Sequence, residues 1–84
     1  MPHRIEFAPA AAREFRKLPR SAQVRLGKRI EKLATDPRPD GVRKLSDGSY
    51  RIRIGDYRVL YQVHDAQLLI VVIRVRNRKD AYGG

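Results

Sequence analysis

Apolar residues near the start of the chain recur with a spacing of two, as they do in a strand. Ile5 and Phe7 alternate with the polar residues Arg4 and Glu6, so one side of this segment is apolar and the other is charged. Proline cannot donate a ladder hydrogen bond, and we therefore expect the strand to end at Pro9. The pattern predicts a short first strand.

Helical spacing follows, in two segments joined by a short turn. Pro9 suits the first turn of a helix that Pro19 ends, and the apolar residues between them are Ala12, Phe15 and Leu18. Ser21 is the expected N-cap of a second helix, which Pro37 ends. Its apolar stripe consists of Ala22, Leu26, Ile30, Leu33 and Ala34. The spacing predicts a helical hairpin with one buried side.

The second half of the chain returns to a period of two. The segment Asp36 to Asp47, with two prolines, one glycine and many charges, predicts a loop. From Tyr50 the apolar residues alternate with arginines, and Gly55-Asp56 is typical of a two-residue type II′ hairpin turn. The apolar side of this hairpin comprises Tyr50, Ile52, Ile54, Tyr57, Val59, Tyr61 and Val63.

The last predicted strand is apolar at every position from Leu68 to Ile73. Such a run is expected of a central strand that is covered on both faces. A second turn lies near Asp65 and Ala66, and its length sets the register. A two-residue turn would put Arg74 beside Tyr57, whereas one extra loop residue would put it beside Arg58. The sequence leaves these two registers open.

These elements predict one α+β domain that spans residues 1–84. The expected order is β-α-α-β-β-β, with two N-terminal helices packed on one face of a small, mostly antiparallel sheet. A chain of this length cannot be divided into two stable cores, so every apolar segment contributes to one. The sheet face away from the helices is where function is expected.

Three arginines of the hairpin fall on that outer face. If Gly55-Asp56 is the turn, Arg53 lies directly opposite Arg58, and Arg51 shares their side. Like charges that oppose one another across a hairpin are destabilising, whereas a phosphate bound between them would turn repulsion into attraction. The alternative is that the long side chains only cover apolar neighbours such as Leu60.

The composition indicates an acidic partner, RNA before all others. The chain has nineteen Lys and Arg against nine Asp and Glu, a formal net charge of +10, and most of the excess is arginine. The guanidinium group binds phosphate in a bidentate manner and stacks on bases. Further candidates for RNA contact are Arg25, Lys28, Arg29, Lys32, Arg74 and Arg76. For the four helical cations, a solvated helix face is the alternative.

The composition also excludes several classes of site. There is no cysteine, so neither a disulfide nor a thiolate metal site can form. His3 and His64 lack metal-ligand spacing, and we interpret both as structural. No glycine-rich phosphate loop occurs, the carboxylates are scattered, and we expect neither metal nor cofactor. No segment has the length or apolar character of a membrane span or signal peptide, so we expect a cytoplasmic protein with no membrane partner.

Three motifs and the order of the elements resemble the RelE/ParE toxin superfamily, on its RelE side. The motifs are FRKLP at residues 15–19, YRIRIGDYRVLY at 50–61 and RKDAY at 78–82. The resemblance covers nearly the whole chain, and the central motif is its most specific part. It implies the toxin of a type II toxin-antitoxin system, a metal-independent endoribonuclease that cleaves mRNA in the ribosomal A site and inhibits translation.

The resemblance also implies a catalytic set. In the family, the ribose 2′-hydroxyl attacks its adjacent phosphate and leaves a cyclic phosphate. The positions that match are Arg51, Arg53, Arg58, Arg78 and Tyr82. By this analogy Arg53 and Arg58 stabilise charge on the scissile phosphate, Arg78 protonates or neutralises the leaving oxygen, and Tyr82 stacks on or orients the nucleotide.

The chain departs from the family pattern at two places. Arg51 stands where well-studied members have a lysine that could act as general base, and arginine remains protonated at neutral pH. This favours electrostatic stabilisation by Arg51, with a ribosomal group or water taking the proton. Arg76-Asn77 stands where many relatives read Gly-His, which removes another possible base.

The implied partners are mRNA, the 30S ribosomal A site and an acidic, RelB-like antitoxin, with DNA reached only indirectly through the antitoxin. Two other functions remain open. One is a ParE-like inhibitor of DNA gyrase that acts by protein binding. The other is an RNA-binding module without chemistry.

Overall fold

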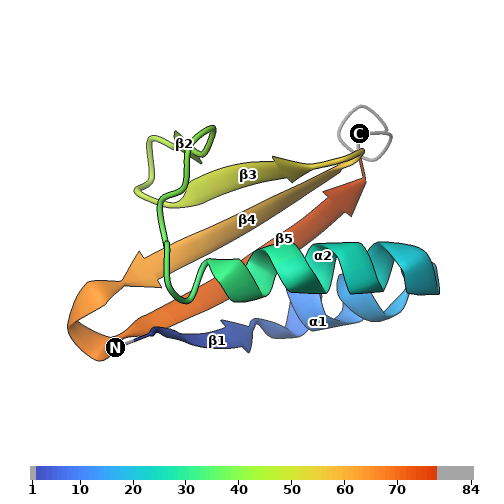
Figure 1. Ribbon diagram of the computed structural model, residues 1–84, viewed down its shortest axis with the longest axis horizontal. Helices are drawn as coiled ribbons and strands as arrows, with labels where there is room; N and C mark the ends of the chain where they lie inside the picture. Colours follow the sequence, from blue (N-terminus) through green and yellow to red (C-terminus); the bar gives the residue numbers. More distant parts are fainter. Residues whose placement is uncertain (1, 78–84) are drawn as a thin grey trace.

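The computed structural model describes residues 2–77, which form two helices and a mixed five-stranded sheet (Figure 1). The elements in chain order are β1 (Arg4–Phe7), α1 (Pro9–Arg16), α2 (Arg20–Lys32), β2 (Arg43–Lys44), β3 (Tyr50–Ile54), β4 (Tyr57–His64), a 3₁₀ turn (Asp65–Gln67) and β5 (Leu69–Asn77). The strand order is β1-β5-β4-β3-β2, and β1 runs parallel to β5 while the other pairs are antiparallel. The predicted α+β class is confirmed.

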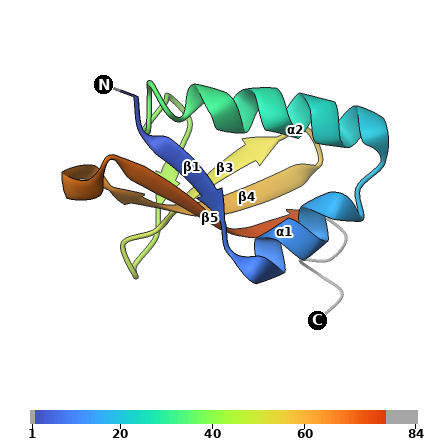
Figure 2. The same cartoon turned by 90° about the horizontal axis from the view of Figure 1, so that it is seen from below.

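The core lies between α2 and the sheet. Helix α2 crosses one sheet face, and α1 lies beside it against the C-terminal half of β5 (Figure 2). Four residues of the predicted stripe are buried, Ala22, Leu26, Ile30 and Leu33, with Leu26 fully inaccessible and Ile30 at 2% exposure. Ala34 lies beyond the end of α2 and is half-buried. Val59 and Tyr61 of β4 are fully buried in the same core. The amphipathic spacing therefore identified the correct side of the second helix.

The predicted N-cap of the second helix is wrong. Helix α2 begins at Arg20, its N-cap is Pro19, and Ser21 lies exposed within its first turn. The Pro19 carbonyl accepts the first helical hydrogen bond from the Gln23 N–H at 3.0 Å. The Gln23 side chain donates to the Leu18 carbonyl at 3.0 Å, which holds the entering chain. The extended backbone of Pro19 thus starts the helix without a side-chain cap.

The predicted loop also contains a strand. β2 pairs with β3 within the segment that composition marked as irregular. The chain turns back through residues 45–49, where the Leu45 N–H donates to the Ser49 carbonyl at 2.8 Å. Asp47 accepts from the Ser49 N–H at 3.0 Å and from its hydroxyl at 2.6 Å, and Gly48 has φ +91°. Two paired residues are too few to leave a periodic pattern in the sequence.

The hairpin turn at Gly55-Asp56 is confirmed. Gly55 has φ +60° while Asp56 does not have a positive φ, as a type II′ turn requires. The register follows, with Arg53 opposite Arg58 and Ile54 opposite Tyr57.

The register of β5 differs from both alternatives. The pair His64 with Leu69 leaves four residues in the second turn, including Leu68 in the left-handed region at φ 50°. A β-bulge then follows, because Leu60 pairs with Arg74 while Tyr61 pairs with Val72. The extra residue between these two pairs is Ile73.

This bulge decides which way the end of β5 faces. Side chains alternate between the two faces of a strand, so one inserted residue exchanges the faces of everything after it. Without it, the register of the first half of β5 would place Arg74 opposite Val59, toward the core. With it, Val75 is buried at 4% exposure, and Arg74 and Arg76 reach the outer face.

Strand β5 is central, between β1 and β4, as predicted. Its two faces are covered unequally. Ile70 and Val72 are fully buried under the helices, whereas Leu69, Val71 and Ile73 on the other side are half-buried. The expectation of equal cover on both faces is wrong for the outer face.

Candidate nucleic-acid interface

Three arginines stand side by side on the outer face, on three neighbouring strands. Arg53 of β3 lies directly opposite Arg58 of β4, and Arg58 lies directly opposite Arg76 of β5. Directly opposed side chains start about 5 Å apart. We call these three residues the arginine row. The sequence predicted the opposition of Arg53 and Arg58, and the structure adds Arg76.

The arginine row concentrates positive charge on the outer face. Within residues 2–77, none of the three guanidinium groups forms an ion pair with a carboxylate. Asp56 lines the same small hollow as Arg53 and Arg58 at the hairpin turn, yet it pairs with neither. Two direct like-charge oppositions without compensation are unfavourable for the sheet alone. The row is therefore suited to an external anion.

Arg51 lies on the same face, two residues before Arg53. It is directly opposite Leu60 on β4 and opposite Arg43 on β2. Arg51 and Leu60 are both half-buried, which fits an arginine stem that covers an apolar neighbour. Coverage of Leu60 and binding of an anion are compatible here, because the guanidinium group ends beyond the stem.

Arg74 differs from the arginine row because it already has an acidic partner. Its Nη2 donates to Glu14 Oε2 at 2.8 Å and its Nε to the same oxygen at 3.1 Å. Glu14 also accepts the Val75 N–H at 2.7 Å, at the edge of β5 that β1 leaves unpaired. Burial opposes ionisation of Glu14, but these hydrogen bonds outweigh it and lower its pKa. Arg74 therefore has a partner within the fold, and its predicted contact with RNA stays a prediction.

The four helical cations do not join the arginine row as a group. Arg25, Lys28, Arg29 and Lys32 are exposed on α2, which covers the opposite sheet face (Figure 2). Arg29 and Lys32 line a hollow beside Asp36 and Ile52. The Arg25 guanidinium lies 3.5 Å from the position that a Cβ on Gly55 would take. Arg25 therefore reaches the hairpin turn.

The remaining predicted site residues cannot be placed. Arg78 and Tyr82 lie outside the described residues, so their contribution to the site stays a prediction. Among residues 2–77, no group of three His, Asp or Glu side chains is arranged to hold a metal ion. In the same range, no helix is long and apolar enough to cross a membrane.

Sequence reasoning missed a polar cluster at the other end of β4. Arg38 Nη2 donates to Asp65 Oδ2 at 2.8 Å, and Arg38 Nε donates to the Tyr50 hydroxyl at 2.9 Å. His3 Nε2 lies 3.2 Å from Asp65 Oδ1. We call these four residues the polar end cluster. The bond from Arg38, and then that from His3, lowers the pKa of Asp65. No local pattern signals contacts between residues so distant in the chain.

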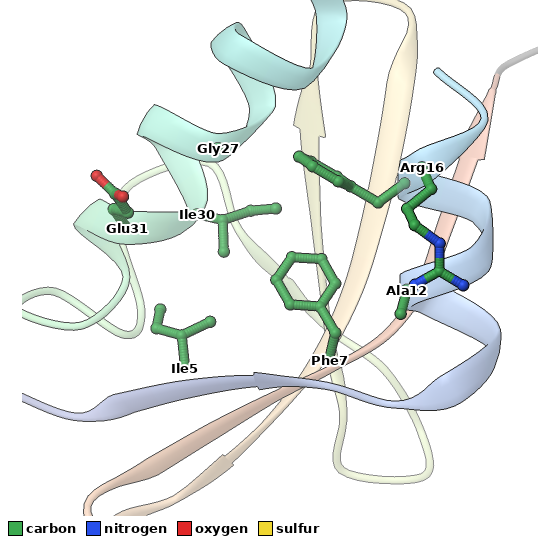
Figure 3. A pocket seen from close by; sticks show the side chains of 8 residues that line it. Ile5, Phe7, Ala12, Arg16, Gly27, Ile30 and Glu31 are labelled. Atoms are coloured by element: carbon green, nitrogen blue, oxygen red, sulfur yellow. The ribbon is translucent and has the colours of Figure 1, made fainter. Parts of the chain in front are cut away.

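An apolar hollow of about 470 Å³ opens between β1, α1 and α2. Figure 3 shows Ile5, Phe7 and Ile30 facing it, with Arg16 and Glu31 at its sides. Apart from these two charged residues its walls are hydrocarbon and backbone. The hollow lacks the converging polar groups that chemistry on a phosphate would need. The candidate site is therefore the outer sheet face that carries the arginine row and Arg51, which we call the arginine face.

The fold is a small basic α+β domain with a row of arginines on its outer sheet face. Residues 5–82 match the family described as ParE toxin of type II toxin-antitoxin system, parDE. The chain therefore belongs to the RelE/ParE superfamily of type II toxin-antitoxin toxins. The predicted resemblance is confirmed.

Individual relatives agree with this assignment. The chain is 32% identical to Toxin RelG of Mycobacterium tuberculosis, over 98% of each chain. It is 31% identical to the mRNA interferase toxin RelE of Escherichia coli K12, over 98% of this chain and 92% of that protein. The crystal structure of the toxin-antitoxin complex RelBE2 from M. tuberculosis superposes with a TM-score of 0.82 at 27% identity, covering 93% of this chain and 100% of the other.

Proposed function

We propose that this toxin is a ribosome-dependent mRNA endonuclease that acts without a metal ion and thereby inhibits translation. The observation that carries the proposal is the direct opposition of Arg53 and Arg58 on an outer face where neither has an acidic partner among residues 2–77. Preorganised cations stabilise charge that develops in a transition state. The similarity to a protein named mRNA interferase toxin RelE supports RNA as the substrate.

The proposed reaction is a transesterification within the RNA. The ribose 2′-oxygen forms a bond to the adjacent phosphorus, the bond from phosphorus to the 5′-oxygen breaks, and a 2′,3′-cyclic phosphate and a 5′-hydroxyl remain. Arg53 and Arg58 stabilise the added negative charge on the phosphate. Arg51 holds the RNA, and a ribosomal group or water accepts the 2′-hydroxyl proton. Arg78 protonates the leaving 5′-oxygen, or neutralises it while water supplies the proton, and Tyr82 stacks on or orients the nucleotide.

A translation reaction with mapped mRNA ends tests this function. Purified toxin is added to translating ribosomes, and to the same message without ribosomes. We expect new 5′ ends within the coding region only where ribosomes are present. Intact message at every dose would refute the proposal.

The proposed regulatory partner is an acidic, RelB-like antitoxin in the same cytoplasm. The similar M. tuberculosis structure is described as a toxin-antitoxin complex. A formal net charge of +10 favours an acidic partner, and the apolar hollow between β1, α1 and α2 offers room for an apolar side chain. An antitoxin over the helices and the arginine face would block RNA, and contact with DNA would occur through the antitoxin alone.

A second candidate is inhibition of DNA gyrase, which the match to a family described as ParE toxin favours. Such an inhibitor would act by binding protein, and it would have no use for opposed arginines without carboxylate partners. A supercoiling assay separates the two functions, since only the gyrase inhibitor stops supercoiling while leaving mRNA intact. An RNA-binding module without chemistry would bind RNA in a salt-dependent manner but leave both messages and supercoiling unchanged.

A further inference from the structure

The bulge at Ile73 places Arg76 on the outer face. In the register of the first half of β5, Arg76 would face the core opposite Tyr57. The inserted residue moves it to the outer face, directly opposite Arg58. Bulges are often found beside functional sites, where they redirect a side chain. Here the redirected side chain extends the arginine row to a third strand.

The charge of the row exceeds what one phosphate can neutralise. A phosphodiester carries one negative charge, whereas the row presents three guanidinium groups. Arg58 has a like charge directly opposite it on both sides. A single phosphate between Arg53 and Arg58 would relieve the first opposition and leave the second in place. Relief of both requires a second anion between Arg58 and Arg76.

The neighbouring carboxylate does not supply that anion. Glu14 lies close enough for Arg76 to help lower its pKa, although burial acts in the other direction. Its oxygens, however, are engaged by Arg74 and by the Val75 N–H at 2.7 to 3.3 Å. Arg76 itself forms no ion pair with any of residues 2–77. Glu14 therefore neutralises one cation of β5 and leaves the next one available.

We propose that Arg76 binds a second RNA phosphate, next to the one held between Arg53 and Arg58, so that the RNA backbone crosses the sheet from β3 toward β5. Arg76 is then a residue that positions the RNA and raises affinity, and it does not act on the reacting atoms. This inference rests on the proposed function for the identity of the polyanion. It adds the path of the RNA backbone across the sheet and the number of phosphates that the arginine row contacts.

Binding of a short single-stranded RNA to the full chain tests the proposal. The RNA carries 2′-O-methyl riboses, which prevent cleavage, and a neutral methylphosphonate replaces one phosphate at a time. The proteins are wild type, Arg76→Gln, Arg58→Gln and a matched control, Arg20→Gln. Arg20 is exposed on α2 and forms no ion pair within residues 2–77.

We expect RNA binding by the wild-type protein to weaken when either of two adjacent phosphates is neutralised. Arg76→Gln should bind roughly two- to fivefold more weakly, as for an exposed ion pair, and should lose sensitivity at one of the two phosphates. Its slope of log affinity against log salt should fall by about 0.7, the value for one phosphate contact on a single strand. Arg58→Gln should lose sensitivity at the other phosphate or at both, and Arg20→Gln should behave as wild type.

Two results would overturn the inference. One is an Arg76→Gln variant that stays sensitive to both phosphates, and the other is a wild-type protein that does not bind the RNA even at low salt. Both are distinct from failure of the proposed function. Cleavage of mRNA in translation together with an inert Arg76 removes the inference alone, whereas intact mRNA together with two-phosphate binding removes the nuclease alone.

Discussion

Arginines near the two ends of β4 differ in whether they have an acidic partner. Beyond its C-terminal end, Arg38 has an ion pair with Asp65, a hydrogen bond to Tyr50 and a position 5.4 Å from the centroid of the Tyr50 ring. At its N-terminal end, Arg58 faces two further arginines and has no carboxylate partner among residues 2–77. Arginine thus connects separate segments of the chain at the C-terminal end of β4, whereas at the N-terminal end three arginines concentrate positive charge.

The difference separates basic residues that stabilise the fold through a carboxylate partner from basic residues that are available to bind an external anion. Nine acidic residues cannot neutralise nineteen basic ones, so their placement is informative. Asp65 ties the second turn to Arg38 and His3, and Glu14 ties α1 to β5. Among residues 2–77, no carboxylate pairs in this way with the arginine row. Substitutions at the two ends should therefore affect different properties.

The largest effect is expected for Arg58→Ala in the cleavage reaction. Loss of one preorganised group that stabilises transition-state charge typically lowers the rate by about 10²- to 10³-fold. Because Arg58 is on the outer face, the variant should unfold in urea at or above the wild-type midpoint. Mapped mRNA ends in a translation reaction measure the rate, with Arg20→Ala as the control. Cleavage within twofold of wild type would remove Arg58 from the site.

A smaller effect, on stability, is expected for Glu14→Ala. The substitution frees the Val75 N–H and the Arg74 side chain, and it should lower the free energy of unfolding by about 1 to 2 kcal/mol. It also leaves Arg74 without its carboxylate partner. RNA affinity should therefore rise and should depend more steeply on salt concentration. Urea unfolding and RNA titration measure the two changes. Glu31→Ala, at an exposed residue of α2, is the control that should change stability little.

A fall in stability together with a rise in RNA affinity would show that Glu14 both supports the fold and withholds Arg74 from RNA. A Glu14→Ala variant as stable as wild type would contradict the role of Glu14 as a clamp on β5. If stability fell while RNA affinity also fell, Glu14 would be positioning the end of β5 rather than withholding Arg74 from RNA.

How much of this could be predicted from the sequence depends on the range of each interaction. The opposition of Arg53 and Arg58 follows from strict alternation and a two-residue turn at Gly55, which together leave one register. The core side of α2 follows from its periodic stripe. Both are local, and the structure confirms both.

Features that depend on distant contacts could not be predicted in this way. The bulge at Ile73 is hidden because residues 68–73 are all apolar, so a change of face within them leaves no polar mark. The pairs Glu14 with Arg74 and Arg38 with Asp65 join residues 60 and 27 positions apart. Such pairs exist only once the sheet has brought their elements together.

Acid should weaken the paired contacts first. The folded-state pKa values of Glu14 and Asp65 are both lowered from their usual 4.5 and 3.8. Carboxylates with lowered values contribute stability that is fully present above the unfolded pKa and is lost as pH falls through the folded one. The urea midpoint should therefore be flat above about pH 5 and decline below it. Glu14→Gln should start lower and decline less, and an equal decline would contradict this assignment.

The smallest effect provides the most direct test of the comparison, because one substitution made at the two ends should change stability in opposite directions. Arg53→Gln removes a like-charge opposition and should stabilise the fold by about 0.3 kcal/mol, a gain that disappears at high salt because screening removes the repulsion. Arg38→Gln removes the partner of Asp65 and Tyr50 and should lower the urea midpoint. The loss should be smaller at high salt, which screens the exposed ion pair with Asp65, but should not disappear, because the hydrogen bond to Tyr50 is also lost. If both variants were destabilised, the arginine row would stabilise the fold itself. Only RNA-binding measurements would then support a phosphate site at the row.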